Sequence, residues 1–224
     1  MTIKTATPNP CPKHWGKSLV LLAAHGSETT PEGAEFVRRQ AEALRQRGIF
    51  GDVRATFMRD VPHPRDIIAT SDYQHIYVVP FMVSDGHSID IMIPEAMALD
   101  GTLTEMITQT DHKRVYLCRA VGTHRAVRNW SRDIISSITT DHGLSPDDTG
   151  ALVLCHGTTR HQGGRNYAEQ VTRDIHNSGL VARTAMLFLE EAPRIDEWRS
   201  CVPSRYVIAL PYLMTSGRHG AFDI

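Results

Sequence analysis

Short apolar runs alternate with longer amphipathic stretches near the start of the chain. The runs are SLVLLAA, DVRATFM and HIYVVPFMV. Runs of this length that are apolar almost throughout are typical of strands buried on both faces, as in a parallel sheet. The segment TTPEGAEFVRRQAEALRQRG, between the first two runs, has apolar residues at helical spacing and Gly48 at its end, and PRDIIAT opens a shorter helix. The pattern predicts strand, helix, strand, helix, strand.

The same order of elements returns later, in ALVLCHG, GGRNYAEQVTRDIHNSG, VARTAMLFL and RYVIALPYLM. Landmark residues of the two parts keep one separation, since 156 − 25, 193 − 62 and 211 − 80 all equal 131. The pairs are His25 and His156, Pro62 and Pro193, and Pro80 and Pro211. Several landmarks in one register predict an internal duplication of one α/β unit. Alternating strands and helices predict parallel sheets with right-handed crossovers.

We expect residues 18–140 to form the first half, residues 141–150 a linker rich in turn formers, and residues 151–224 the second half. The first half is expected to end with a helix in PEAMALDGTLTEMITQ and a strand in RVYLCRAV. The second half ends early, after the segment that matches Gly86–Ile91, so it lacks a counterpart of that helix and strand. Residues 1–17 hold three prolines and no apolar signal-peptide core, which predicts a flexible tail.

The composition indicates a soluble globular protein and argues against several partners. The 24 basic and 25 acidic side chains are mixed along the sequence and leave a net charge of −1, which gives no reason to expect binding to nucleic acid or a membrane surface. No apolar segment reaches transmembrane length. The four cysteines are scattered without a C-x-x-C pair, so neither a zinc ribbon nor a thioredoxin-like site is indicated. Isolated thiols suit the reducing cytoplasm, where we expect the protein to work.

Polar residues follow each predicted strand. Ligands of a parallel sheet bind beyond the carboxyl ends of its strands, so these residues form the candidate site. They are His25, Arg59-Asp60 and Gly86-His87 in the first copy, and His156, Glu190-Glu191 and Gly217-Arg218-His219 in the second. Imidazole and carboxylate ligands suit cobalt, iron, nickel or zinc. A single histidine is more often an ordinary core residue, but histidines at equivalent places in both copies favour a divalent-metal site.

Residues 19–224 resemble the class II tetrapyrrole chelatases, the family of the sirohydrochlorin cobaltochelatases and ferrochelatases. The resemblance rests on V-L-L-x-x-H-G-S, the proline after the second strand, the V-V-P-F strand, and a Gly-His pair followed by Asp-Ile. It implies two flavodoxin-like α/β halves that face each other across a cleft. It also implies a lyase that inserts Co²⁺ or Fe²⁺ into sirohydrochlorin or a related modified tetrapyrrole, in cobalamin or sirohaem biosynthesis. Neither ATP nor a cofactor beyond the substrate metal is then expected.

The resemblance also implies roles for particular residues. In the active half, the family has a metal-binding histidine after the first strand, a glutamate after the second and a histidine after the third. His156, Glu190 and His219 match this set, so we predict that the second half binds the metal and catalyses its insertion. His25 and His87 match the two histidine positions of the first half and are predicted to be further metal ligands.

Arg59 stands where the first half would carry the glutamate. With Arg160, Arg165 and Arg218 it could pair bidentately with the carboxylates of a tetrapyrrole, although surface arginines are more often simply solvated. In the second half a neutral imidazole could hold the metal and accept a proton. Glu190 could accept the second proton or bind the incoming ion.

Other interpretations stay open. The chain could be a non-catalytic metal- or tetrapyrrole-binding relative of the chelatases, and two chains could pair as a homodimer. Gly16-Lys17-Ser18 resembles the end of a P-loop, but it precedes the first strand instead of following it, so no nucleotide site is predicted. A phosphohistidine enzyme would need an arginine before its His-Gly pair, where this sequence has Ala24 and Cys155.

Overall fold

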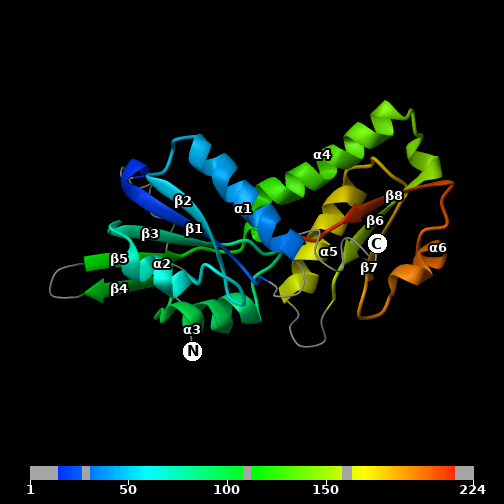
Figure 1. Cartoon of the computed structure of the whole chain (residues 1–224). Helices are drawn as coiled ribbons and strands as arrows, with labels where there is room; N and C mark the ends of the chain where they lie inside the picture. Colours follow the sequence, from blue (N-terminus) through cyan, green and yellow to red (C-terminus); the bar gives the residue numbers. More distant parts are fainter. Residues whose placement is uncertain (1–14, 27–30, 108–111, 158–162, 215–224) are drawn as a thin grey trace.

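The computed structural model describes residues 15–26, 31–107, 112–157 and 163–214. These residues form two α/β units that lie side by side (Figure 1). Within the described residues, the first unit has a five-stranded sheet of order β2-β1-β3-β5-β4, and the second has a three-stranded sheet of order β7-β6-β8. The predicted fold class, two tandem α/β units, is confirmed.

The strands are β1 (Ser18–Ala24), β2 (Asp52–Phe57), β3 (His75–Pro80), β4 (Leu103–Ile107), β5 (His112–Leu117), β6 (Thr149–Cys155), β7 (Arg183–Phe188) and β8 (Tyr206–Pro211). The α-helices are α1 (Pro31–Gln46), α2 (Pro64–Thr70), α3 (Ile93–Met97), α4 (Arg125–Asp141), α5 (Gly163–Asn177) and α6 (Trp198–Cys201). Short helical turns are η1 (Trp15–Lys17), η2 (Ser88–Met92), η3 (Val121–Thr123), η4 (Pro146–Asp148) and η5 (Ile195–Glu197). In these segments no helix combines the length and the apolar character needed to cross a bilayer.

Strand β1 lies inside the first sheet, and each of its residues is buried. It pairs in parallel with β2 on one side and with β3 on the other. The strand order therefore reverses at β1, because β2 lies on one side of it and β3 on the other. The carboxyl end of β1 is the switch point at which ligands of such sheets bind. Strand β6 has the same place between β7 and β8. The order of the parallel strands in the first sheet, β2-β1-β3-β5, is that of flavodoxin-like sheets.

The duplication holds strand by strand. The pairs β1 and β6, β2 and β7, and β3 and β8 each begin and end 131 residues apart, as at Ser18 and Thr149 (149 − 18 = 131). Gly26 and Gly157, each after the histidine that follows the first strand, have positive φ angles of 72° and 80°. A Cβ at Gly26 would also lie 2.8 Å from the Cβ of Phe57, so this turn requires glycine. The repeat thus extends beyond the strands to the turns that carry the histidines.

Residues 103–107 do not continue the helix predicted in PEAMALDGTLTEMITQ. Helix α3 ends early because Ala98 adopts a left-handed conformation (φ 53°) and Gly101 a second one (φ 78°). Leu103–Ile107 forms β4 instead, antiparallel to β5. Its side chains alternate, with Met106 packed against the core and Leu103 exposed, which is the two-residue period of an edge strand. The expectation of a helix there is wrong, and β4 adds one antiparallel edge to an otherwise parallel sheet.

Helix α4 precedes the expected linker but packs on the second sheet. Ile135 is fully buried in a cluster with Val153 of β6 and Val171 of α5. Arg128 Nε lies 3.7 Å from Asp174 Oδ2 of α5, and Figure 1 shows the two helices next to each other. By packing, α4 therefore belongs with the second unit, although all but its last residue lie in the range 18–140 that the sequence places in the first.

The two units are joined near the carboxyl ends of β3 and β5. Asp85 accepts hydrogen bonds from Arg119 Nε at 3.0 Å and from the Tyr167 hydroxyl of α5 at 3.3 Å. Arg119 also donates to the Tyr167 hydroxyl. A second link is the hydrogen bond from the Tyr212 hydroxyl to the Gly122 carbonyl, at 2.8 Å. Burial raises the pKa of Tyr212 to about 12, so this hydroxyl remains a donor at neutral pH.

Gly122→Ala should destabilise the protein, because a Cβ at this position would lie 2.0 Å from the Val83 carbonyl oxygen. Overpacking of this kind costs about 1–3 kcal/mol, and here the Tyr212 hydrogen bond would be displaced as well. Urea denaturation followed by circular dichroism should show a lower midpoint than the wild type. Gly16→Ala is the control, since nothing lies within 4 Å of a Cβ there. Equal midpoints for the two variants would contradict this packing.

Candidate functional site

His156 and Glu190 lie side by side at the carboxyl edge of the second sheet. The parallel pairing of β6 with β7 continues past both strands, since Glu190 N donates to His156 O at 3.1 Å. The side chains meet as a result: His156 Nδ1 lies 3.7 Å from Glu190 Oε2, and 44% and 54% of the two side chains are exposed. This edge therefore offers an accessible imidazole and carboxylate, a donor pair suited to a divalent metal.

The ring of His156 is oriented by its own turn. Nδ1 lies 2.8 Å from the carbonyl oxygen of Gly157. A carbonyl oxygen only accepts, so Nδ1 carries the proton of this hydrogen bond, and the basic lone pair of the neutral ring is then on Nε2. Metal-binding histidines are commonly held this way, with one ring N–H on a carbonyl or carboxylate and the other nitrogen on the metal. The orientation of His156 fits a metal ligand that binds through Nε2.

His25 has the same backbone setting in the first unit but a different neighbour. Arg59 N donates to His25 O at 2.8 Å, so a guanidinium takes the place that a carboxylate has in the second unit. His25 Nε2 lies 3.1 Å from Ser88 Oγ. Although His25 keeps an exposed surface, burial of its ring lowers the imidazole pKa below the usual 6.5, and the positive charge of Arg59 lowers it further. The first unit therefore favours a neutral His25 beside a fixed positive charge.

In each unit an arginine engages the acidic residue three positions after the second strand, Asp60 or Glu191. In the second unit, Arg165 lies 5.0 Å from the centroid of the Phe188 ring, and its Nη1 lies 3.5 Å from Glu191 Oε2. The first unit has the same arrangement, at 4.9 and 3.5 Å, in Arg38, Phe57 and Asp60. Sequence comparison missed it because the two arginines are 127 residues apart (165 − 38 = 127), one helical turn out of the repeat register. These contacts tie α1 and α5 to the strand ends.

The predicted ligand set of the second unit is described only in part. His156 and Glu190 are adjacent, whereas His219 lies outside the described residues, as do Arg160 and Arg218. Among the described residues, no three or more His, Cys, Asp or Glu side chains are grouped so that they could hold a metal. The complete set of His156, Glu190 and His219 stays a prediction.

In the first unit, Ser88 is the contact of His25 that sequence reasoning missed. Its only signal was its position directly after the Gly86-His87 pair. His87 itself is exposed and directly precedes η2. The roles of His25 and His87 as metal ligands stay predictions.

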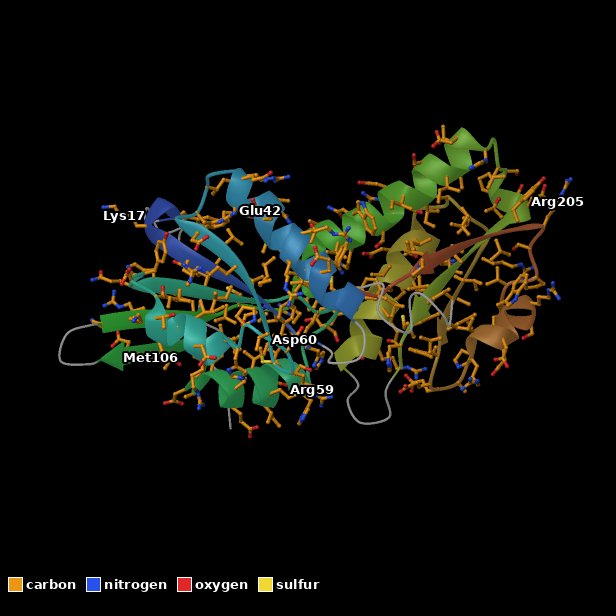
Figure 2. The ribbon with its side chains drawn as sticks, viewed as in Figure 1. Lys17, Glu42, Arg59, Asp60, Met106 and Arg205 are labelled. Atoms are coloured by element: carbon orange, nitrogen blue, oxygen red, sulfur yellow. The ribbon has the colours of Figure 1, made fainter. Side chains whose placement is uncertain are left out.

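The candidate site lies where the two units approach each other. Figure 2 shows Arg59 and Asp60 at the end of the first sheet nearest the second unit, and Lys17 and Met106 toward the far end. A hollow lined in part by Lys17 and residues 72–75 lies at that far end, where β1 and β3 begin. Ligand chemistry at the carboxyl edge does not involve that hollow.

A model of the CbiX family matches residues 19–138, which is more than half of the chain. The chain belongs to the CbiX family of chelatases.

Individual relatives agree with this assignment. Over 218 residues the chain is 26% identical to a Halobacterium salinarum protein described as a probable sirohydrochlorin cobaltochelatase, a match that covers 92% of this chain and 74% of that protein. A multi-domain Deinococcus radiodurans protein with structural similarity to chelatases has a TM-score of 0.72 at 23% identity, covering 91% of this chain and 45% of that one. This chain thus spans less than half of the Deinococcus protein. The structure of CbiX, the terminal enzyme for sirohaem biosynthesis in denitrifying bacteria, has a TM-score of 0.63 at 21% identity, covering 86% and 77%. The two solved structures confirm the chelatase fold.

Two cysteines of this CbiX-family chain, Cys155 and Cys118, are protonated in the metal-free protein. Burial, with a smaller contribution from the negative charge of Glu191, raises the pKa of Cys155, the last residue of β6, to about 12. Burial likewise raises the pKa of Cys118 to about 11. A thiol binds metal as its thiolate, so both side chains act as small apolar groups at neutral pH.

His25 should titrate below pH 6.5 in the metal-free protein, and Arg59→Gln should raise its pKa because it removes the positive charge and leaves the burial. An NMR titration of the ring protons measures both values, with Arg47→Gln as the control. The unfolded chain binds this proton at a higher pH than the native chain. The contribution of His25 to stability is therefore fully present above pH 6.5 and is lost as the pH falls toward the native pKa. An unchanged His25 pKa in Arg59→Gln would show that the guanidinium does not act on the ring.

Proposed function

We propose that this CbiX-family chain inserts Co²⁺ or Fe²⁺ into sirohydrochlorin or a related modified tetrapyrrole, in cobalamin or sirohaem biosynthesis. The adjacent His156 and Glu190, 3.7 Å apart at the carboxyl edge, carry the proposal. The Halobacterium relative, described as a probable sirohydrochlorin cobaltochelatase, supports it. In this proposal the enzyme works in the cytoplasm, uses no ATP, and needs no cofactor besides the metal that is its substrate.

The chemistry follows from what metal insertion requires. A partly dehydrated ion must be held by a few ligands that can release it, and the two pyrrole N–H protons must leave as the metal enters. Insertion therefore exchanges one M²⁺ for two protons. His156 Nε2 and the Glu190 carboxylate hold the ion in this proposal, and His219 completes the set. As the ion passes to the ring nitrogens, the carboxylate and imidazole become bases that can accept those protons.

A second candidate is a non-catalytic metal- or tetrapyrrole-binding protein. Arg59 favours it, because the first unit carries an arginine where the predicted ligand set needs a carboxylate. Such a protein would bind both substrates without raising the rate at which the metal enters the ring.

The absorbance of sirohydrochlorin on addition of Co²⁺, or of Fe²⁺ without oxygen, separates the two candidates. The wild type should change the spectrum faster than the uncatalysed reaction does. His156→Ala should lower the rate by about 10²–10⁴-fold, the range typical of a group that transfers protons in catalysis, and His25→Ala should lower it less. His142→Ala is the control. His142 follows α4 and precedes η4 and the amino end of β6, whereas the site lies at the carboxyl end of that strand.

If the protein produced no metal-dependent spectral change above the uncatalysed rate, the enzyme hypothesis would be contradicted and the binding protein would remain. If only His25→Ala abolished insertion, the assignment of the working site to the second unit would be wrong.

A further inference from the structure

The residue that follows the second strand by two positions has opposite charge in the two units. Arg59 and Glu190 occupy equivalent places, since 190 − 59 = 131. Each backbone N–H donates to the carbonyl of the neighbouring histidine, at 2.8 Å in the first unit and 3.1 Å in the second. With the backbone the same, the side chain at this one position decides whether the edge attracts cations or anions.

Arg59 differs from the arginines around it. Arg38 is engaged by Asp60 and the Phe57 ring, and Arg119 is engaged by Asp85. Within the part of the chain that the structure describes, the guanidinium of Arg59 forms no hydrogen bond and no ion pair. It is exposed, and Figure 2 shows it at the end of the first sheet nearest the second unit. An exposed guanidinium without an acidic partner can pair with an acidic group of a ligand.

The neighbours of Arg59 suit a carboxylate ligand. A guanidinium binds a carboxylate with two parallel N–H donors. The Ser88 hydroxyl, 3.1 Å from His25 Nε2, supplies another polar group on the same side of the first unit. The nearest acidic side chain along the chain, Asp60, is held by Arg38 and by the Val61 N–H at 2.7 Å, so it does not neutralise Arg59. The positive charge of the Arg59 guanidinium would repel a divalent metal ion at His25 and so oppose the binding of the metal.

We propose that the end of the first unit formed by His25, Arg59 and Ser88 binds a carboxylate of the tetrapyrrole and not the metal. The units then divide the work: the second takes the cation at His156 and Glu190, and the first anchors the acidic edge of the ring. This inference rests on the proposed function for the identity of the ligand. Arg59, which is equivalent in position to Glu190, is then the residue that gives the first copy a different role from the second.

The test measures the two ligands separately, without insertion. Metal-free sirohydrochlorin binding is followed by absorbance titration, and Co²⁺ binding without tetrapyrrole by calorimetry. Arg59→Gln should weaken sirohydrochlorin binding by about tenfold and Arg59→Glu by more, since charge-assisted pairs contribute about 1.5–3 kcal/mol and each 1.4 kcal/mol is a factor of ten. Neither change should weaken Co²⁺ binding. Glu190→Gln should weaken Co²⁺ binding, and His25→Ala should leave it unchanged.

Arg47→Glu is the matched control, because it makes the same change of charge in the turn after α1, away from the carboxyl edge of the sheet. Arg59→Lys, which keeps the charge but not the paired donors, should fall between the wild type and Arg59→Gln. Circular dichroism confirms that each variant is folded.

The proposal is overturned if the Arg59 variants bind sirohydrochlorin as the wild type does, or if His25→Ala lowers the number of Co²⁺ ions bound per chain. Either result leaves the proposed function intact as long as the wild type inserts metal. Conversely, a protein that inserts no metal but loses tetrapyrrole affinity in Arg59→Gln would remove the proposed function and keep the carboxylate site.

Discussion

One backbone hydrogen bond in each unit sets the geometry of the candidate site. The parallel ladder between the first and second strands runs past both strand ends, so that Arg59 N reaches His25 O and Glu190 N reaches His156 O. The next turn is fixed by a glycine with positive φ, Gly26 or Gly157, that no other residue replaces without strain. These constraints are independent of the side chains that the ladder aligns. The same scaffold can therefore present either a carboxylate or a guanidinium beside the histidine.

This independence explains how two copies of one unit carry different chemistry. The buried strands need apolar side chains, and both copies keep them. The residue beside the histidine is exposed in both units, so a change of its charge has little consequence for the core. The acidic residues one position further on, Asp60 and Glu191, have less freedom to vary. Arg38 and Arg165 bind them and also stack on Phe57 and Phe188.

The parallel strands and the longer helices followed from apolar runs and helical spacing, which depend on local sequence. The predictions that failed or fell short depend on other parts of the chain. Leu103–Ile107 forms a strand because β5 offers it an edge and because the backbone turns at Ala98 and Gly101. His25 and Ser88 are 63 positions apart, and no repeated sequence pattern marks their contact. The ligand set of the second unit was inferred from family resemblance, and His219 lies outside the described residues.

Helix α4 has a consequence for how the two units depend on each other. The helix comes before the segment expected to link the halves, yet Ile135 is part of the second core. Removal of residues up to 141 would therefore take Ile135 out of the second core and expose part of the apolar surface around Val153 and Val171 to water. The expected boundary near residue 141 between the repeated segments is therefore not the boundary between the two hydrophobic cores.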